Sequence, residues 1–459
     1  MKKMKTNKLI IFTVLAAFFA SCESELEIDP KQREDATITL STEKGITDIL
    51  TGTYSILANG DIYGGRIQVS GDLMGQTGVT STTNFRWRGT FASFRQMYSK
   101  TLIVDNDLVR QIWARNYEAI NATNIVIEKI GLVEDPDKAK TMIAEAKFIQ
   151  SLAYFDLVRF FAKPYDSSIG ANNQLGVIIR PNAIYDFSAD LAAERSTVEQ
   201  VYTLVINNLN QAYNDLPADN GFYANKYAAK ALLARVYLQK QDYANALLAA
   251  DEVIQDSGAA LSPTYKEAFN HDVNQIEDIF AIQITKQTGD NQLVNHYASE
   301  DNGGRGGDVE IRNTYLSKFT DPNDERRNFN YINPDNGRRL SSKFTNQFGD
   351  VPVIRLAEMV LIRAEANFRL GSTTGATPLD DINSLRTRAK ATNFASVTLA
   401  QILNERVLEL AMEGFAIHDI KRTKATIGGT YAWNSDLLVF PIPLRETDNN
   451  KKITQNPGY

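Results

Sequence analysis

An alanine-rich stretch at residues 227–254 constrains the fold of this chain more than any other segment. It reads as two helical runs that break at Gln241 and Asp242. Small side chains recur in both runs, with Ala231 in the first and Ala250 in the second, and would allow paired helices to approach closely. This pattern is typical of a tetratricopeptide unit, whose period is about 34 residues. The segment therefore predicts stacked helical hairpins.

Helical spacing recurs along most of the chain. Apolar residues at steps of three and four fall on one helix face. Gly371 follows one of these segments at the place of a helix C-cap. The helical segments expected on this basis are 113–127, 148–155, 201–216, 353–370, 380–391 and 400–421.

Two long polar stretches interrupt the helical pattern, at residues 59–105 and 285–350. Both are rich in Gly, Asn, Asp, Thr and aromatic residues. Loops this long in a compact protein usually serve a function or lack fixed structure. We therefore predict a mainly α fold, a tetratricopeptide-like helical-repeat body with loop-rich insertions that carry minor β structure and the ligand site.

Few residues have the chemistry of catalysis or metal binding. Cys22 is the sole cysteine of the sequence, which excludes an internal disulfide and a cysteine-rich zinc site. His271, His296 and His418 lie far apart, and no HExxH, GxSxG or phosphate-binding GxxxxGK[ST] motif occurs. We therefore predict no enzymatic activity, no cofactor and no metal.

The first 22 residues read as an export signal. Lysines precede an apolar run at residues 9–20, which is shorter than the roughly 20 residues that span a bilayer. Residues 1–21 are therefore predicted to be a signal peptide, with a buried core helix as the alternative. Cys22 follows the small residues Ala20 and Ser21, as in lipoproteins whose cysteine thiol receives a diacylglycerol group. Two or more acyl chains anchor a protein stably.

The charge balance argues against nucleic-acid binding. The chain carries 49 basic and 55 acidic residues, a formal charge of −6, and four of its lysines lie within residues 1–21. Removing those four leaves 45 basic against 55 acidic residues, or −10 by the same count. Such a surface repels phosphate backbones, so a neutral or cationic ligand is expected.

Several segments stand together in a recognisable order. WARNYEAINATN at 113–124 and the ending FPIPLRETDNNKKITQNPGY at 440–459 are the first and last of them. In this order they resemble the motifs of the SusD/RagB family over nearly the whole mature chain, although Ala416 occupies a position where the family usually has arginine. The other matching segments are 145–165, 353–371, 382–390 and 405–422.

The resemblance implies a SusD-like fold, with an N-terminal region at 36–260 and a C-terminal region at 261–459 packed as one body. It also implies a lipoprotein of the outer membrane, facing the cell exterior, that binds oligosaccharide and delivers it to a SusC-like TonB-dependent transporter. The acidic tether at 22–35 resembles the signal that sends such lipoproteins to the cell surface. A solvated linker would have the same composition.

The matching motifs place acidic residues and arginines on helices that we expect to be buried. A buried charge needs a partner, and arginines are available in the same motifs. The acids are Glu358, Glu365, Glu405 and Glu413, and the arginines are Arg355, Arg386, Arg388 and Arg406.

Sugar recognition combines flat aromatic faces with amide and charged groups that bind hydroxyls. The first polar stretch contains such residues in a short segment expected to be exposed, with packing of Trp87 onto the helical body as the alternative. The family places hydroxyl-binding residues in the same region. The second stretch should form an opposing wall, in which His296 is expected to be an ordinary surface residue. The candidate ligand-binding residues are Asp72, Asn84, Phe85, Arg86, Trp87, Asn291, Tyr297 and Arg305.

Three other functions fit parts of the sequence. A peptide ligand in place of a glycan would resemble the RagB branch of the family. A surface hydrolase would need a pair of carboxylates across a cleft, and Asp72 has no assignable partner. A tetratricopeptide scaffold for another protein's tail would not need the two long insertions.

Overall fold

The computed structural model describes residues 39–78, 83–186, 188–287 and 289–459. The predicted signal peptide at 1–21, the lipidation site Cys22 and the tether at 22–35 lie outside the described residues. None of the helices in the described ranges is long and apolar enough to cross a membrane.

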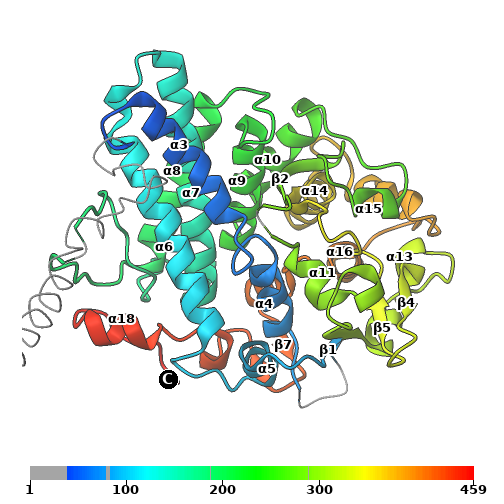
Figure 1. Cartoon of the computed structure of the whole chain (residues 1–459). Coiled ribbons are helices and arrows are strands. Elements are labelled where there is room, and N and C mark those ends of the chain that lie inside the picture. Colours follow the sequence, from blue (N-terminus) through cyan, green and yellow to red (C-terminus); the bar gives the residue numbers. More distant parts are fainter. Residues whose placement is uncertain (1–38, 79–82, 187, 288) are drawn as a thin grey trace, which may run out of the picture.

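Antiparallel helices that pack in chain order form the body of the protein. In Figure 1 the long helices α3, α6 and α7 lie side by side, and each following helix packs against the one before it. The chain of contacts continues from α10 to α14, so helices from both halves of the sequence pack against each other. These helices are α3 (Glu43–Leu57), α6 (Asp107–Glu128), α7 (Pro136–Phe161), α8 (Val198–Asp215), α9 (Lys226–Lys240), α10 (Tyr243–Asp256), α14 (Leu356–Leu370) and α15 (Pro378–Arg388).

The hairpin of α9 and α10 confirms the prediction made from the alanine-rich stretch. Gln241 ends α9 in a left-handed conformation with φ 61°, and the Asp242 side chain caps α10 by accepting a hydrogen bond from the Asn245 amide. Ala231 and Ala250 are fully buried. Small residues thus let the two helices pack closely, and the protein is mainly α with a tetratricopeptide-like body.

The predicted helix at 400–421 is wrong in one respect, because it is two helices, α16 (Leu399–Glu409) and α17 (Ala416–Arg422). Met412 and Gly414 adopt positive φ of 67° and 90° in the turn between them. A Cβ atom at Gly414 would lie 2.7 Å from the Gln68 Cα, so glycine is required there. The first residues of the predicted helix at 353–370 likewise belong to a strand, β6 (Val351–Arg355).

The two polar stretches are more ordered than long loops, because both contain short helices and strands. Strand β1 (Phe85–Trp87) of the first stretch pairs antiparallel with β3 (Val309–Ile311) of the second and brings the two together.

The other strand pairs of the described residues are β2 (Asp278–Ile282) with β6, β4 (Asn330–Ile332) with β5 (Arg339–Ser341), and β7 (Thr426–Ile427) with β8 (Tyr431–Ala432). The short helices are α4 (Arg66–Met74), α5 (Ala92–Ser99), α11 (Gln292–Tyr297), α12 (Asn313–Leu316), α13 (Glu325–Asn328) and α18 (Leu444–Asn449). Single 3₁₀ turns are η1 (Ile130–Leu132), η2 (Ser167–Ile169), η3 (Tyr265–Ala268), η4 (Glu300–Asn302) and η5 (Asp436–Leu438).

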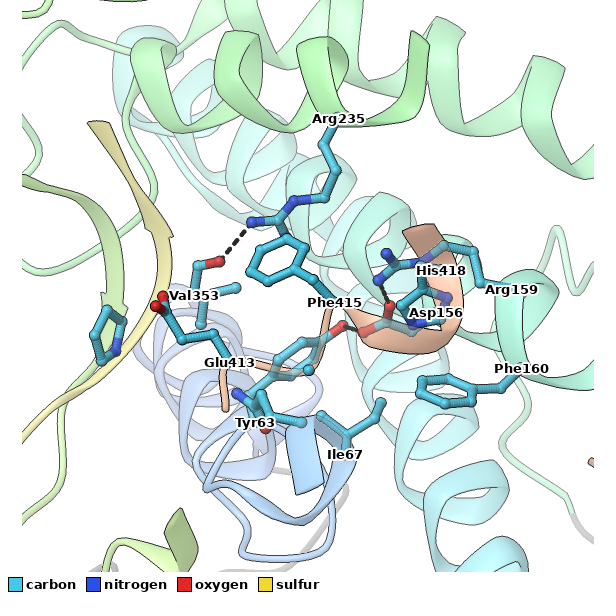
Figure 2. A pocket seen from close by; sticks show the side chains of 13 residues that line it. Tyr63, Ile67, Asp156, Arg159, Phe160, Arg235, Val353, Glu413, Phe415 and His418 are labelled. Carbon is cyan, nitrogen blue, oxygen red and sulfur yellow. Dashed lines mark hydrogen bonds and ion pairs between the residues drawn. The ribbon is translucent and has the colours of Figure 1, made fainter. Parts of the chain in front are cut away.

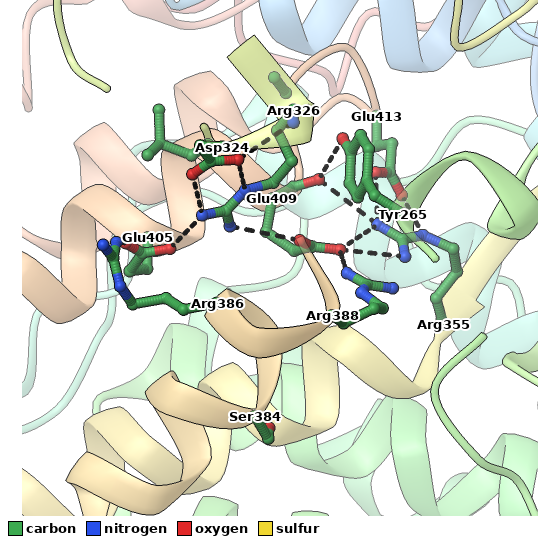
Figure 3. A network of polar contacts seen from close by, with 12 residues as sticks. Tyr265, Asp324, Arg326, Arg355, Ser384, Arg386, Arg388, Glu405, Glu409 and Glu413 are labelled. Carbon is green, nitrogen blue, oxygen red and sulfur yellow. Dashed lines mark hydrogen bonds and ion pairs between the residues drawn. The ribbon is translucent and has the colours of Figure 1, made fainter. Parts of the chain in front are cut away.

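A network of buried ion pairs joins the carboxyl-terminal helices and confirms that the acids of the motifs have partners. Figure 3 shows Arg326 between Asp324 and Glu405, and Arg388 beside Glu409. Three of the predicted acids pair with arginines of the predicted set: Glu413 with Arg355, Glu405 with Arg386, and Glu358 with Arg406. Glu358 also pairs with Arg235, and Glu365 pairs with Arg422 and Arg369, arginines that were not among those predicted. Removing one partner of such a pair leaves an uncompensated buried charge, so the network fixes how these helices pack.

Candidate functional site

A cavity of about 440 Å³ opens between the end of α4 and the turn from α16 to α17. Its volume lies in the range of roughly 300–1,000 Å³ that is typical of ligand sites. On one side α16 presents Leu403 and Val407, which with its C-cap residue Leu410 form an apolar stripe that borders the cavity. The polar side chains of the lining are those of Asp72, Gln76, Thr83, Asn84, Lys318, Asn404, Arg406, Asp419, Arg422, Thr423 and Thr426.

Two glycines allow α4 to reach this turn. A Cβ atom at Gly71 would lie 2.3 Å from the Gly414 carbonyl oxygen, and one at Gly75 would lie 2.5 Å from the Ala416 Cβ. Real Cβ atoms do not approach other atoms so closely. The backbone of α4 therefore packs directly against the turn, and Asp72, between the two glycines, becomes part of the cavity wall.

Asp72 is a buried carboxylate in this wall, with 2% of its surface exposed. Its Oδ2 atom accepts hydrogen bonds from the Tyr297 hydroxyl at 2.9 Å and from the Gly414 amide at 3.1 Å. Burial raises the pKa of Asp72 to about 7, although these hydrogen bonds act in the opposite direction. Burial thus favours the neutral form of the Asp72 carboxyl over its carboxylate.

Asp419 is a second carboxylate of the wall, and it is held ionised. Arg406 donates from Nε to its carboxylate at 3.0 Å, and Arg422 donates from Nε at 2.7 Å. Burial alone would raise the pKa of Asp419, but the two guanidinium groups lower it below the ordinary value. The pair of carboxylates thus differs strongly in proton affinity.

Gln76 and Asn84 are joined in the wall of the cavity. The Gln76 Oε1 atom accepts a hydrogen bond from the backbone N–H of Asn84 at 2.8 Å. The backbone carbonyl of Asn84 accepts one from the backbone N–H of Arg312 at 3.0 Å. The backbone of Asn84 is therefore fixed at the start of β1, with its half-buried side chain in the wall.

A second cavity lies behind Phe415 and is much smaller, about 40 Å³. Figure 2 shows its polar side, where the Tyr63 hydroxyl and the Arg159 guanidinium both contact the Asp156 carboxylate. Burial lowers the pKa of His418, which also lines this space, well below its ordinary value. The volume suits a water molecule rather than a sugar ring, so we regard the larger cavity as the candidate site.

Comparison with known families covers nearly the whole chain in two adjoining matches. Residues 25–238 match a family described as "Starch-binding associating with outer membrane", and residues 239–459 match one described as "SusD family". The chain belongs to the SusD family. The predicted resemblance is therefore confirmed.

Individual SusD relatives agree with this assignment. SusD-like protein P2 of Formosa agariphila is 25% identical, with both chains covered in full. The starch-binding protein SusD of Bacteroides thetaiotaomicron is 33% identical over 34% of this chain and 29% of its own length. Two solved structures have the same fold as this chain. One is a SusD superfamily protein of B. thetaiotaomicron, with a TM-score of 0.78, 24% identity and coverage of 91% of this chain and 100% of that one. The other is a SusD-like carbohydrate-binding protein of Bacteroides vulgatus, with a TM-score of 0.76, 19% identity and coverage of 90% and 97%.

The structure of this SusD-family chain brings three of the candidate ligand residues to the cavity: Asp72, Asn84 and Phe85. Arg86 is exposed on the other face of β1 and does not line the cavity. Arg305 is also exposed, and its guanidinium lies 4.4 Å from the ring centroid of Phe91. A ligand role for these residues remains a prediction.

Trp87 is not exposed but packs into the body, which was the alternative left open by the sequence. The side chain is 6% exposed, and its ring centroid lies 5.1 Å from that of Phe94 and 6.0 Å from that of His296. His296 is itself fully buried, and its Nδ1 lies 2.8 Å from Asp308, so it is not a surface histidine. Because β1 is paired with β3, alternation turns Phe85 and Trp87 into the core and Arg86 outward.

Asn291 and Tyr297 are also buried, with 2% and 1% of their surfaces exposed, and their contacts are internal. The Asn291 carboxamide caps α11 by accepting from the Leu293 amide and donates to the Gly349 carbonyl. Tyr297 donates to Asp72 and so supports the cavity wall from behind. The second polar stretch thus contributes support to the wall through these residues.

Sequence reasoning missed the contribution of α16 and α17 to the cavity. The periodic stripe at Leu403 and Val407 indicated a helix face but could not show that the face borders a space. Ala416 was the available signal, since it stands in the lining at a position where the family usually has the longer arginine.

Proposed function

We propose that this protein captures an oligosaccharide at the outer membrane and delivers it to a SusC-like TonB-dependent transporter. The observation that carries the binding proposal is the cavity of about 440 Å³ in a chain of the SusD family. Its mixed lining suits a sugar, because apolar side chains can cover C–H groups while Asn84, Gln76 and Asn404 offer amides to hydroxyls.

The binding is proposed to occur without chemistry on the ligand. A glycoside hydrolase uses two carboxyl groups on either side of the scissile bond. In this cavity Asp419 is engaged by two arginines, and Asp72 by Tyr297 and Gly414. Within the described residues there is also no group of three or more His, Cys, Asp or Glu side chains that could hold a metal ion.

Calorimetric titration of the soluble protein with neutral oligosaccharides tests this function. A panel of malto-, cello-, xylo-, manno- and laminari-oligosaccharides should include at least one ligand, and chromatography should recover that ligand unaltered. A protein that binds no member of the panel contradicts the proposal. Shortened products after a long incubation would instead indicate a hydrolase.

A peptide is the second candidate ligand, and the apolar stripe of α16 favours it. Leu403 and Val407 of this stripe, together with Ile420 of α17, are half-buried around the cavity and could contact the side chain of a peptide. Titration with a tryptic digest of casein, followed by mass spectrometry of the retained fraction, separates the two ligand classes.

We further propose that the protein is anchored at the cell exterior by lipid on Cys22. The support is the sequence pattern of residues 1–22 and the family's description as associated with the outer membrane. The acidic tether at 22–35 would leave the folded body free to meet a transporter.

A further inference from the structure

A groove between α3 and α7 is separate from the candidate cavity in both its helices and its lining residues. Its volume is about 430 Å³, close to that of the candidate cavity. Figure 1 shows α3 in the upper left of the molecule, whereas β1 and β7 beside the candidate cavity lie at the bottom. The groove is lined by Thr47, Leu50, Thr51 and Tyr54 of α3, by Asp137, Lys138, Thr141, Met142 and Glu145 of α7, and by Pro217, Asn220 and Tyr223.

The lining combines an apolar floor with hydroxyl-bearing walls. Leu50 and Met142 are buried at the floor, while the Thr51 and Thr141 side chains are exposed or half-exposed. The Thr51 hydroxyl donates to the Thr47 carbonyl at 3.1 Å and keeps its acceptor sites available. The groove therefore offers both apolar contact and polar groups to a ligand.

Tyr223 places an aromatic face at one end of the groove. It is 41% exposed, yet its position is fixed, because its ring centroid lies 4.7 Å from that of Tyr54. The connection between α8 and α9 that carries Tyr223 turns at Gly221, where φ is 60°. A ring that is exposed on one side and packed on the other needs no rearrangement to stack on a ligand.

A buried carboxylate holds this end of the groove together. Glu145 is 6% exposed and accepts hydrogen bonds from the Tyr54 hydroxyl at 2.6 Å and from the Asn220 carboxamide at 3.2 Å. The Tyr54 hydroxyl in turn accepts from the Ala224 amide at 3.1 Å, next to Tyr223. Through these bonds α3, α7 and the connection before α9 position the aromatic face as one rigid unit.

The charges of the groove select against an anionic ligand. The lining contains the acids Asp137 and Glu145 and one cation, Lys138. Lys138 is already paired with Glu43, with 2.9 Å between Nζ and Oε1. A sulfate or a uronate in the groove would have to compete with Glu43 for Lys138 and would meet the acids Asp137 and Glu145.

We infer that the groove between α3 and α7 is a second saccharide-binding site, which takes a neutral sugar unit against the exposed face of Tyr223. The inference rests on the proposed saccharide function and adds a site on the helical body. An aromatic face with adjacent hydroxyl and amide groups is what a pyranose needs. Two sites on one chain increase the retention of a long glycan, since release from one leaves it held at the other.

The test uses the neutral oligosaccharide that wild-type protein binds in the panel above, with calorimetry to give both stoichiometry and affinity. Wild type should bind two short oligosaccharides per chain. Tyr223→Ala should weaken one of the two binding events by at least about tenfold, by analogy with aromatic stacking on nucleic-acid bases. Tyr223→Phe keeps the ring and should stay within about twofold of wild type on the same basis.

Phe222→Ala is the matched control, because Phe222 is 57% exposed beside Tyr223 but does not line the groove. It should bind like wild type, with circular dichroism confirming that every variant is folded. Two full binding events in Tyr223→Ala would overturn the second site and leave the proposed function standing. A weaker association of Tyr223→Ala with a co-purified transporter, with sugar binding unchanged, would overturn it in favour of a protein contact. Binding of no oligosaccharide by wild type would overturn both.

Discussion

The Tyr297 hydroxyl donates a hydrogen bond to the Asp72 carboxylate at 2.9 Å, joining α11 to α4 across 225 residues of sequence. Both side chains are almost completely buried. Burial of Asp72 costs free energy whenever its carboxylate is ionised, and this hydrogen bond offsets part of that cost. The wall of the candidate cavity is thus built on a group whose ionisation opposes folding.

Stability should therefore fall as the pH rises through the range in which Asp72 ionises. Because burial raises the pKa of Asp72 from 3.8 to about 7, the folded state binds more protons than the unfolded state between these values. The free energy of unfolding of wild type should drop relative to Asp72→Asn by at most about 4 kcal/mol from pH 4 to pH 7. Urea unfolding at several pH values measures this difference. Parallel pH profiles for wild type and Asp72→Asn would show that Asp72 is not the titrating group.

Asp419→Asn provides the opposite case. Although burial opposes it, Arg406 and Arg422 lower the pKa of Asp419, so its carboxylate stabilises the folded state above the unfolded pKa. This variant should lose stability at neutral pH and regain it relative to wild type under acid conditions.

Ala416→Arg should fill the candidate cavity and weaken ligand binding. Ala416 lies in the lining beside Asp72 and Asp419, so a guanidinium at this position would meet two carboxylates and would not be stranded. We expect the variant to fold and its affinity for the oligosaccharide to fall by at least about tenfold, equivalent to about 1.4 kcal/mol. Titration against Ala416→Ser, which changes the volume little, separates filling from substitution. Unchanged affinity would place the ligand elsewhere.

Trp87→Ala should damage the fold before it affects a ligand contact. The ring packs against Phe94 in the core, and truncating a buried large aromatic costs about 3–5 kcal/mol. Arg86→Ala, on the exposed face of the same strand, should change stability by less than about 0.5 kcal/mol. Urea denaturation of the two variants compares the faces directly. Equal stabilities would contradict the burial of Trp87.

These two neighbours show what the sequence could and could not predict. Helices such as α6 and the α9–α10 hairpin follow from local spacing, since the period of 3.6 residues is written in the chain itself. The burial of Trp87 depends on the pairing of β1 with β3, more than 200 residues away, which no local pattern specifies. Asp72, Asn84 and Phe85 were candidates because their residue types suit a sugar. Their cavity was not predicted, because α16 and α17, which complete it, lie more than 300 residues further along the chain.

Cys22→Ala should release the protein from membranes without unfolding it. Cys22 lies outside the described residues, and loss of its thiol would prevent acylation and with it lipid anchoring. Ser21→Ala keeps a small residue before the cysteine and should remain anchored. Fractionation of outer membranes measures both, and protease treatment of intact cells reports on which side the wild type lies. A Cys22→Ala protein that stays in the membrane fraction would contradict lipid anchoring.

The isolated protein should bind its ligand more weakly than a complex with its transporter does. If the lipid and the acidic tether at 22–35 keep the body beside a SusC-like barrel, a ligand in the cavity can be enclosed between two surfaces. The second contact then forms within one assembly at a high effective concentration, which raises affinity without changing the first contact. Calorimetric titration of the same oligosaccharide into this chain alone and into the co-purified complex measures the difference. A variant with a scrambled acidic segment at 23–29, equal in length and composition, controls for simple tethering. Equal affinities for chain and complex, with no barrel co-purifying from solubilised membranes, would leave an independent surface binder and exclude delivery by this route.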